Sequence, residues 1–181
     1  MGPGGGHVGL LWVNLDGFKS ANDRLGQQAG DVVLSTVGAR LRSAMAANDL
    51  AARLGGDEFG VLCVDLTGKA ELDAVAERIR DALREPFEVD EATILLTASV
   101  GALWIEAGDT DPGALPHRAN LAMLEAKAAG GDRVTYYSPE MEAFAVERAE
   151  LRARLAQAML DHDFDMDYQP IIDVRNGRVV G

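Results

Sequence analysis

The stretch RLGGDEF at residues 53–59 places two glycines and two acids between two short apolar runs. Residues 50–54 and 59–64 each have the length and composition of a β-strand. Glycine readily adopts the backbone conformations that a tight hairpin turn requires. The sequence therefore predicts a β-hairpin that carries Asp57 and Glu58 at its turn.

On both sides of this hairpin the sequence alternates between strand-like and helix-like segments. Apolar, β-prone runs at 8–15, 93–105 and 134–137 predict strands, and apolar residues at helical spacing predict helices at 29–47, 72–83 and 111–129. Asp111 and Pro112 are expected to cap the last of these helices. The order β-α-β-β-α-β-α-β predicts a ferredoxin-like α+β fold, with one mixed central sheet and flanking helices.

Composition limits the classes of function. The chain has 181 residues and a net charge of −12, which argues against a DNA- or RNA-binding surface because phosphate contacts need clustered cations. The longest apolar stretch, residues 92–105, is too short to cross a bilayer. The single Cys63 excludes an internal disulfide framework. These features predict a soluble cytoplasmic protein without a membrane segment.

The acids of the hairpin are the first candidates for chemistry. Glycines let a phosphate approach the backbone, and adjacent carboxylates of Asp57 and Glu58 are suited to Mg²⁺. An ordinary solvated turn is the alternative. Likewise Asn14, Asp16 and Asp31 lie near expected strand and helix ends, where they are either ligands or turn and cap residues.

Combined, these motifs indicate a family. The run NLDGFK at 14–19, Asn22-Asp23, Gly30-Asp31 and RLGGDEF, followed by AKAAG at 126–130, resemble the GGDEF family of diguanylate cyclases over residues 8–137. The resemblance implies the nucleotidyl-cyclase palm, a variant of the ferredoxin-like fold. It also implies condensation of two GTP into cyclic di-GMP with loss of two pyrophosphates, by two facing domains of a homodimer with Mg²⁺ or Mn²⁺.

The resemblance assigns nucleotide contacts to particular residues. Asn22 and Asp31 would hydrogen-bond the guanine edge, and Lys127 would reach the terminal phosphates. The backbone of one short segment would wrap the phosphates: Gly17, Phe18 and Lys19.

The resemblance also assigns the metal site and the catalytic groups. Asp57 would bind the metal together with the Leu15 carbonyl. Glu58 would assist the metal or the 3′-hydroxyl, so that Asp57 and Glu58 are the catalytic pair.

Three positions depart from the family pattern. Asn14 replaces an aspartate that ligates the metal, and an amide holds a hard cation more weakly than a carboxylate does. Gly131 replaces a phosphate-binding arginine, and Arg133 lies two residues further along. The inhibitory motif R-x-x-D keeps Asp49 but has Ala46 in place of its arginine, which predicts weak product inhibition.

The end of the chain resembles the start of an EAL domain, the cyclic di-GMP phosphodiesterase family. YQPIID at 168–173 and GRVVG at 177–181 carry this resemblance, and the sequence stops where the Glu-Ala-Leu motif is expected. The predicted organisation is a GGDEF domain at 1–137, a connector helix at 138–163 and the first strand or strands of a truncated EAL domain at 164–181. The rest of the EAL domain would then be a partner within the parent protein.

Three hypotheses for function follow. The preferred one is a degenerate, GTP-binding regulatory module for the EAL phosphodiesterase. The second is a slow but active diguanylate cyclase in which Asp16 or Glu58 substitutes for the lost ligand. The third is a structural dimerisation module that binds no nucleotide.

Overall fold

The computed structural model describes residues 6–106, 111–161, 167 and 169–179, which form two units. The first unit, Met1–Ala143, holds the strands β1 to β7. Its elements follow in chain order: β1 His7–Asp16, α1 Phe18–Leu25, α2 Gln27–Ala44, β2 Leu50–Gly55, β3 Glu58–Leu66, α3 Lys69–Arg84, β4 Phe87–Val89, β5 Ala92–Ile94, β6 Thr97–Ile105, α4 Leu115–Ala128 and β7 Val134–Tyr136. The helix α5, Glu140–Asp161, begins at the end of this unit and continues into the second, Phe144–Gly181.

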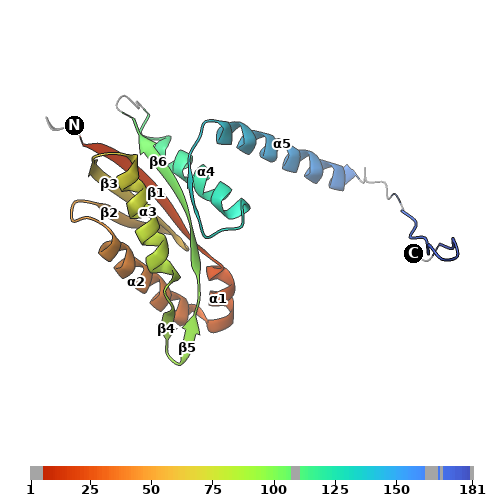
Figure 1. Ribbon diagram of the computed structural model, residues 1–181, viewed down its shortest axis with the longest axis horizontal. Helices are drawn as coiled ribbons and strands as arrows, with labels where there is room; N and C mark the ends of the chain where they lie inside the picture. The colour runs from red at the N-terminus through yellow and green to blue at the C-terminus, as the bar shows by residue number, and fades with distance from the viewer. Residues whose placement is uncertain (1–5, 107–110, 162–166, 168, 180–181) are drawn as a thin grey trace. The chain divides into compact units, whose positions relative to one another are not determined.

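The main sheet has five strands in the order β2-β3-β1-β6-β7 (Figure 1). Strand β1 pairs antiparallel with both β3 and β6, and β7 joins the edge of β6 in parallel. The crossover from β1 through α2 to β2, and from β3 through α3 to β6, gives the predicted ferredoxin-like topology. The α+β fold with a mixed central sheet is therefore confirmed.

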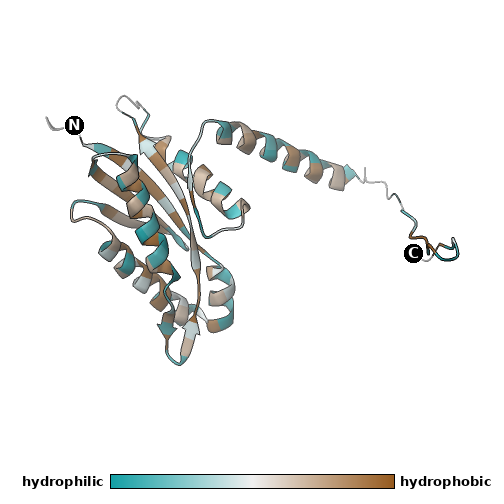
Figure 2. Ribbon diagram, viewed as in Figure 1, coloured by the Kyte–Doolittle hydropathy of each residue, from teal (hydrophilic) through white to brown (hydrophobic). Residues whose placement is uncertain are grey.

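The two faces of β1 meet different helices. Leu11, Val13 and Leu15 are buried on the face that packs against the apolar residues of α2 and α3. On the opposite face α4 lies so close to β6 that a Cβ at Gly101 would be 2.0 Å from the Ala119 carbonyl oxygen. In Figure 2 hydrophobic residues follow the central strands and hydrophilic ones mark the outer side of α3. Asn14 belongs to the α4 face, because side chains alternate along a strand.

Several predicted element bounds were wrong. The region before 29–47 forms a separate helix, α1, and Gly26 at φ +87° makes the break between α1 and α2. The predicted strand at 93–105 is two strands, because β4 and β5 pair as a small hairpin of their own. Asp111 does not cap α4: its Oδ1 accepts the Gly113 N–H at 3.0 Å in a turn, and α4 begins at Leu115.

The second unit consists of α5 and a short C-terminal segment. Among its described residues α5 has no buried side chain, and apolar residues such as Phe144 and Leu155 are exposed. Within residues 167 and 169–179 one antiparallel bridge joins Ile172 to Val179 around a turn, and no longer strand forms there. Residues 162 and 163 of the predicted connector, and 164–166, 168, 180 and 181 of the predicted EAL segment, lie outside the described part. No described helix is long and apolar enough to span a membrane.

Cys63 lies inside the main sheet with no exposed surface. Burial and then the charge of Asp49 raise the pKa of its thiol to about 12. The thiol therefore stays protonated and unreactive at neutral pH.

Arg40 joins α2 to the end of α3. Its Nη1 donates to the carbonyls of Ala82 at 3.1 Å and Glu85 at 2.7 Å, and its Nη2 donates to Pro86 at 2.6 Å. The guanidinium also lies 4.1 Å from the centre of the Phe87 ring. The last carbonyls of a helix have no partner within that helix. One arginine thus caps α3 and fixes it to α2.

We predict that Arg40→Ala lowers the free energy of unfolding by about 2–3 kcal/mol, because three carbonyls lose a charged donor. Arg40→Lys should recover only part of this loss, since a lysine lacks the planar fork. Urea denaturation measures both, with Arg42→Ala on the same helix as a control expected to change stability by less than about 0.5 kcal/mol. Equal effects of Arg40→Ala and Arg42→Ala would contradict this role.

Candidate functional site

The turn of the β2–β3 hairpin meets the C-terminal end of β1. Asn14 is the register partner of Glu58, and the Leu15 N–H donates to the Asp57 carbonyl at 3.3 Å. The Asn14 Nδ2 lies 3.5 Å from Glu58 Oε1. The backbone of the hairpin turn therefore lies beside Leu15, and the Glu58 side chain lies beside that of Asn14.

Asn14 presents a buried side-chain oxygen. The residue is 3% exposed, and its Oδ1 makes no hydrogen bond with the part of the chain that the structure describes. A buried acceptor left unpaired costs roughly 1–3 kcal/mol, so the unpaired oxygen indicates a site for a donor or a cation. The half-buried Glu58 has a carboxylate oxygen beside this amide, and the half-buried Asp57 precedes it at the turn.

These oxygen donors fit a hard divalent cation such as Mg²⁺. The described residues contain no group of three or more His, Cys, Asp or Glu side chains that could hold a metal. The Asn14 amide would add an oxygen donor to such a site, but no charge. The residues fit the ion, but as a weak site.

Asp16 is occupied by other contacts. Its Oδ1 accepts a hydrogen bond from Ser99 Oγ at 2.7 Å, and its Oδ2 accepts from Thr97 Oγ1 at 2.8 Å and the Asp132 N–H at 3.0 Å. These three donors tie the end of β1 to β6 and to the segment between α4 and β7. This geometry favours an anchoring role for Asp16 over metal binding.

The segment after Asp16 turns directly into α1. Gly17 has φ +76° and is the N-cap residue, with no atom within 4 Å of a Cβ placed there. The first turn of α1 contains no acidic residue and receives no side-chain cap. Its free N–H groups, from Phe18 and Lys19 onward, are suited to an anion.

The helices α1 and α2 approach each other at Asn22 and Gly30. A Cβ at Gly30 would lie 2.0 Å from Asn22 Oδ1, so only glycine admits the asparagine at this point. The next residue, Asp31, is exposed on α2. The glycine therefore sets the position of Asn22 relative to Asp31, the two residues predicted to contact guanine.

A groove of about 430 Å³ runs beside Asp31 between α2 and β2. Its lining includes Leu34, Ser35, Arg42, Arg53 and Phe59. Arg53 also donates from Nε and Nη2 to the Gly56 carbonyl at 2.9 and 2.8 Å, which braces the hairpin turn. Volumes of this size hold nucleotide-sized ligands.

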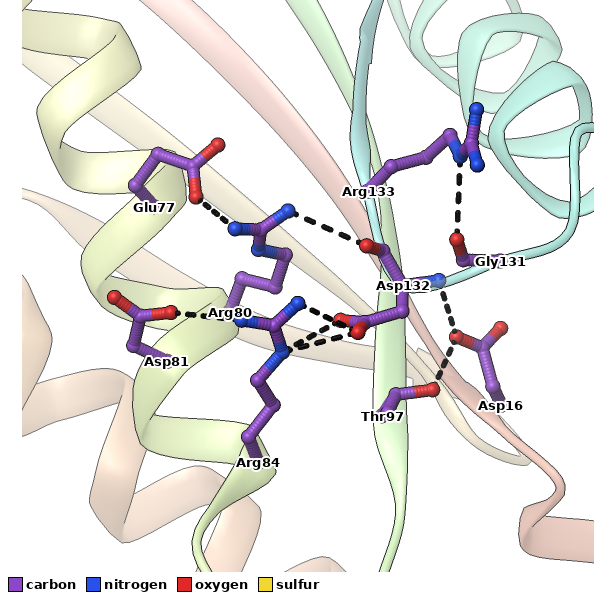
Figure 3. Close-up of polar contacts among 9 residues, drawn as sticks. All are labelled: Asp16, Glu77, Arg80, Asp81, Arg84, Thr97, Gly131, Asp132 and Arg133. Carbon is purple, nitrogen blue, oxygen red and sulfur yellow. Dashed lines mark hydrogen bonds and ion pairs between the residues drawn. The ribbon is translucent and has the colours of Figure 1, made fainter.

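The end of α4 lies beside the end of β1. Lys127 is exposed in the last turn of α4, and Gly131 follows at φ +74°. A Cβ at Gly131 would be 3.0 Å from Asp16 Oδ2. Arg133 folds back so that its Nε donates to the Gly131 carbonyl at 3.2 Å (Figure 3).

Asp49 has a structural role between α2 and β2. Its carboxylate accepts the Ala46 N–H at 2.9 Å and the Val64 N–H at 3.1 Å. It therefore closes the turn in which the inhibitory motif has lost its arginine. Weak inhibition by product stays a prediction.

The comparisons with known proteins agree with the motifs. The family model for "Diguanylate cyclase, GGDEF domain" matches residues 4–133. The chain is 33% identical over 172 residues to the cyclic di-GMP phosphodiesterase NbdA of Pseudomonas aeruginosa, covering 95% of this chain and 22% of NbdA. It is 34% identical over 173 residues to the bifunctional diguanylate cyclase/cyclic di-GMP phosphodiesterase MucR of the same organism, covering 95% of this chain and 25% of MucR.

The fold has close solved counterparts. A structure of the GGDEF domain of TpbB (YfiN) from Pseudomonas aeruginosa superposes with a TM-score of 0.74 at 31% identity, covering 77% of this chain and 82% of that one. The chain spans only about a fifth to a quarter of the length of the two curated relatives.

We predict opposite effects for two glycine substitutions in α2. Gly30→Ala should lower the free energy of unfolding by about 1–3 kcal/mol, because its Cβ would overlap Asn22. Gly38→Ala should raise it by about 0.5–1 kcal/mol, since the nearest atom to that Cβ is 3.9 Å away and alanine favours helix. Chemical denaturation measures both changes. A stabilising Gly30→Ala would show that Asn22 is not held there.

Proposed function

Because this chain belongs to the GGDEF family of diguanylate cyclases, we propose that it binds GTP as a regulatory module with weakened cyclase chemistry, acting on an EAL phosphodiesterase domain of the same protein. The observation that carries the proposal is Asn14, a buried neutral amide with an unpaired oxygen where the family pattern has an aspartate.

Binding depends on groups that this chain retains. Asn22 and Asp31 recognise the guanine edge, supported by the close approach at Gly30 and by the groove beside Asp31. The N–H groups that follow Gly17 and the Lys127 ammonium hold the phosphates. These contacts act in the ground state, so their retention preserves affinity for GTP.

The metal site is the weakened part. Asn14 Oδ1, the Asp57 carboxylate and the Leu15 carbonyl would hold Mg²⁺ or Mn²⁺, with Glu58 beside them. When bound, the ion supplies positive charge to the triphosphate. The family has acidic metal ligands at the positions of Asn14 and Asp57, and in this chain Asp57 alone of the two is charged. Glu58, 3.5 Å from the Asn14 amide, supplies the remaining nearby carboxylate.

Two missing charges slow the chemistry. Loss of a charged metal ligand at Asn14 and of a phosphate cation at Gly131 each removes roughly 2–4 kcal/mol of transition-state stabilisation, by analogy with oxyanion donors. At about 1.4 kcal/mol per factor of ten, the pair lowers turnover by roughly three to six orders of magnitude. Glu58 beside Asn14 favours the second candidate, a slow cyclase that works as a homodimer, over a complete loss of activity.

The regulatory signal has a physical route along α4. This helix carries Lys127 near its end and Arg118 near its start. Glu142, in the first turn of α5, accepts a hydrogen bond from Tyr137 Oη at 2.7 Å, and its Oε1 lies 3.6 Å from Arg118 Nε. The nucleotide end of α4 and the start of the connector are thus joined by one helix. GTP changes the attached activity to the extent that it binds two conformations with different affinity.

We predict Mg²⁺-dependent GTP binding with little formation of cyclic di-GMP. Calorimetry gives the affinity, and chromatography of the same sample gives the product. Asp57→Ala should weaken GTP binding because it removes a charged ligand. Asn14→Asp should raise turnover by at least about thirtyfold, equivalent to roughly 2 kcal/mol.

The control for this experiment is Asn48→Asp, which adds the same charge at an exposed turn and should leave turnover unchanged. Ordinary cyclase turnover by the wild-type domain would contradict the weakened-site proposal. If the domain binds no GTP, the remaining hypothesis is a structural dimerisation module without any nucleotide-dependent effect.

We also predict that GTP alters phosphodiesterase activity in the full-length protein. Glu142→Gln removes the charge that pairs with Arg118 and should reduce the effect of GTP, while Glu147→Gln, exposed on the same helix, should not. Hydrolysis of cyclic di-GMP with and without GTP measures this coupling. If the wild-type protein hydrolyses cyclic di-GMP at the same rate with and without GTP, the regulatory role is excluded.

A further inference from the structure

Asp132, between α4 and β7, is held from three directions (Figure 3). Its carboxylate accepts bonds from Arg84 Nη2 at 2.6 Å and Nε at 2.8 Å. Its carbonyl accepts a bond from Arg80 Nη1 at 3.2 Å, and its N–H donates to Asp16 at 3.0 Å. The residue has φ +49°, a conformation uncommon for a residue with a side chain. These contacts keep the segment in that shape.

The arginines of α3 are themselves positioned. Arg80 Nη2 pairs with Glu77 at 2.6 Å, and Arg84 Nη1 pairs with Asp81 at 3.4 Å, each one helical turn earlier. Arg84 therefore has a carboxylate on its own helix and a second, bidentate one on Asp132. A bidentate arginine–carboxylate pair fixes both distance and orientation.

The contacts continue from Asp132 to the end of β1. Asp16 accepts the Asp132 N–H and the hydroxyls of Thr97 and Ser99. Asp16 directly precedes the N–H groups that begin at Gly17, and Asp132 directly follows Gly131. A single network therefore joins the two segments that face the phosphates in the proposed function.

Helix α3 is also bonded to α2, the helix that carries Asp31, one of the two residues predicted to contact guanine. Arg40 on α2 binds the carbonyls at the end of α3, and Asp31 lies on α2. The helix α3 thus lies between the element that carries the base contact and the segment that carries Asp132.

We propose that Arg84, Asp132 and Asp16 form a positioning relay that holds the two phosphate-facing segments in register and so sets discrimination between GTP and nucleotides with fewer phosphates. None of the three is a catalytic residue. The proposal rests on GTP binding as proposed above. An aspartate at 132 suits this role, since a carboxylate pairs with Arg84 through two charged bonds.

The test compares Arg84→Gln with Arg78→Gln, a second α3 arginine whose Nε donates to the Ala44 carbonyl at 3.2 Å. Arg84→Gln should weaken GTP binding about tenfold, or roughly 1.4 kcal/mol, and change GMP binding less than about threefold. Arg84→Lys should fall between the wild type and Arg84→Gln. Arg78→Gln should leave the ratio of GTP to GMP affinity unchanged. Equal weakening for both nucleotides would overturn the positioning role.

A second measurement needs no nucleotide. Hydrogen exchange of the Asp132 amide reports its bond to Asp16, and Arg84→Gln should accelerate that exchange about tenfold or more relative to Arg78→Gln. Unchanged exchange would overturn the relay, whether or not GTP binds. If the wild-type protein binds no GTP while Arg84→Gln still accelerates exchange of the Asp132 amide, the proposed function and the nucleotide discrimination are contradicted. The positioning relay itself would stand.

Discussion

The site depends on the position of β1, which is hydrogen-bonded along both edges and covered on both faces. Its pairing with β3 places Asn14 opposite Glu58, and its pairing with β6 places Asn14 opposite Ser99. Residues directly opposite each other project to the same face of a sheet. One strand register therefore assembles the polar row, and a slip of one residue would turn every side chain of β1 to the other face.

This constraint gives Asn14 its significance. A carboxylate at this buried position would lie beside Glu58, and two like charges close together are costly unless a cation lies between them. The amide removes that repulsion and leaves one unpaired oxygen. Without a bound cation, Asn14 is therefore less costly at this position than an aspartate would be, and the affinity for a cation falls for the same reason. At position 14, a change that raises the stability of the ion-free protein therefore lowers its affinity for the ion.

Local sequence patterns predicted the parts of the fold that depend on local chemistry. The glycine hairpin and the amphipathic α2 and α3 follow from turn residues and periodicity, whereas the approach of Asn14 to the hairpin acids was expected from the family resemblance. Patterns did not predict the contacts of Asp16 with Asp132 or of Asp132 with Arg84, which join residues 116 and 48 positions apart. Such pairs depend on packing of the finished fold. Helix α1 was not predicted, because its eight residues, Phe18–Leu25, are too few to show a clear helical periodicity.

The relay bears on whether the lost phosphate cation is easily regained. Gly131 has φ +74°, and a side chain there would begin 3.0 Å from Asp16 Oδ2. A residue with a Cβ is strained in this conformation by roughly 1–2 kcal/mol. The backbone has little freedom to relax, because the next residue is tied to Asp16, Arg80 and Arg84. An arginine at 131 would therefore need a change in the relay before its charge could act on a phosphate. The absence of an arginine at 131 is therefore linked to the fixed backbone of the segment around Asp132. Of the two departures from the family pattern, Asn14 is the easier one to reverse by a single substitution.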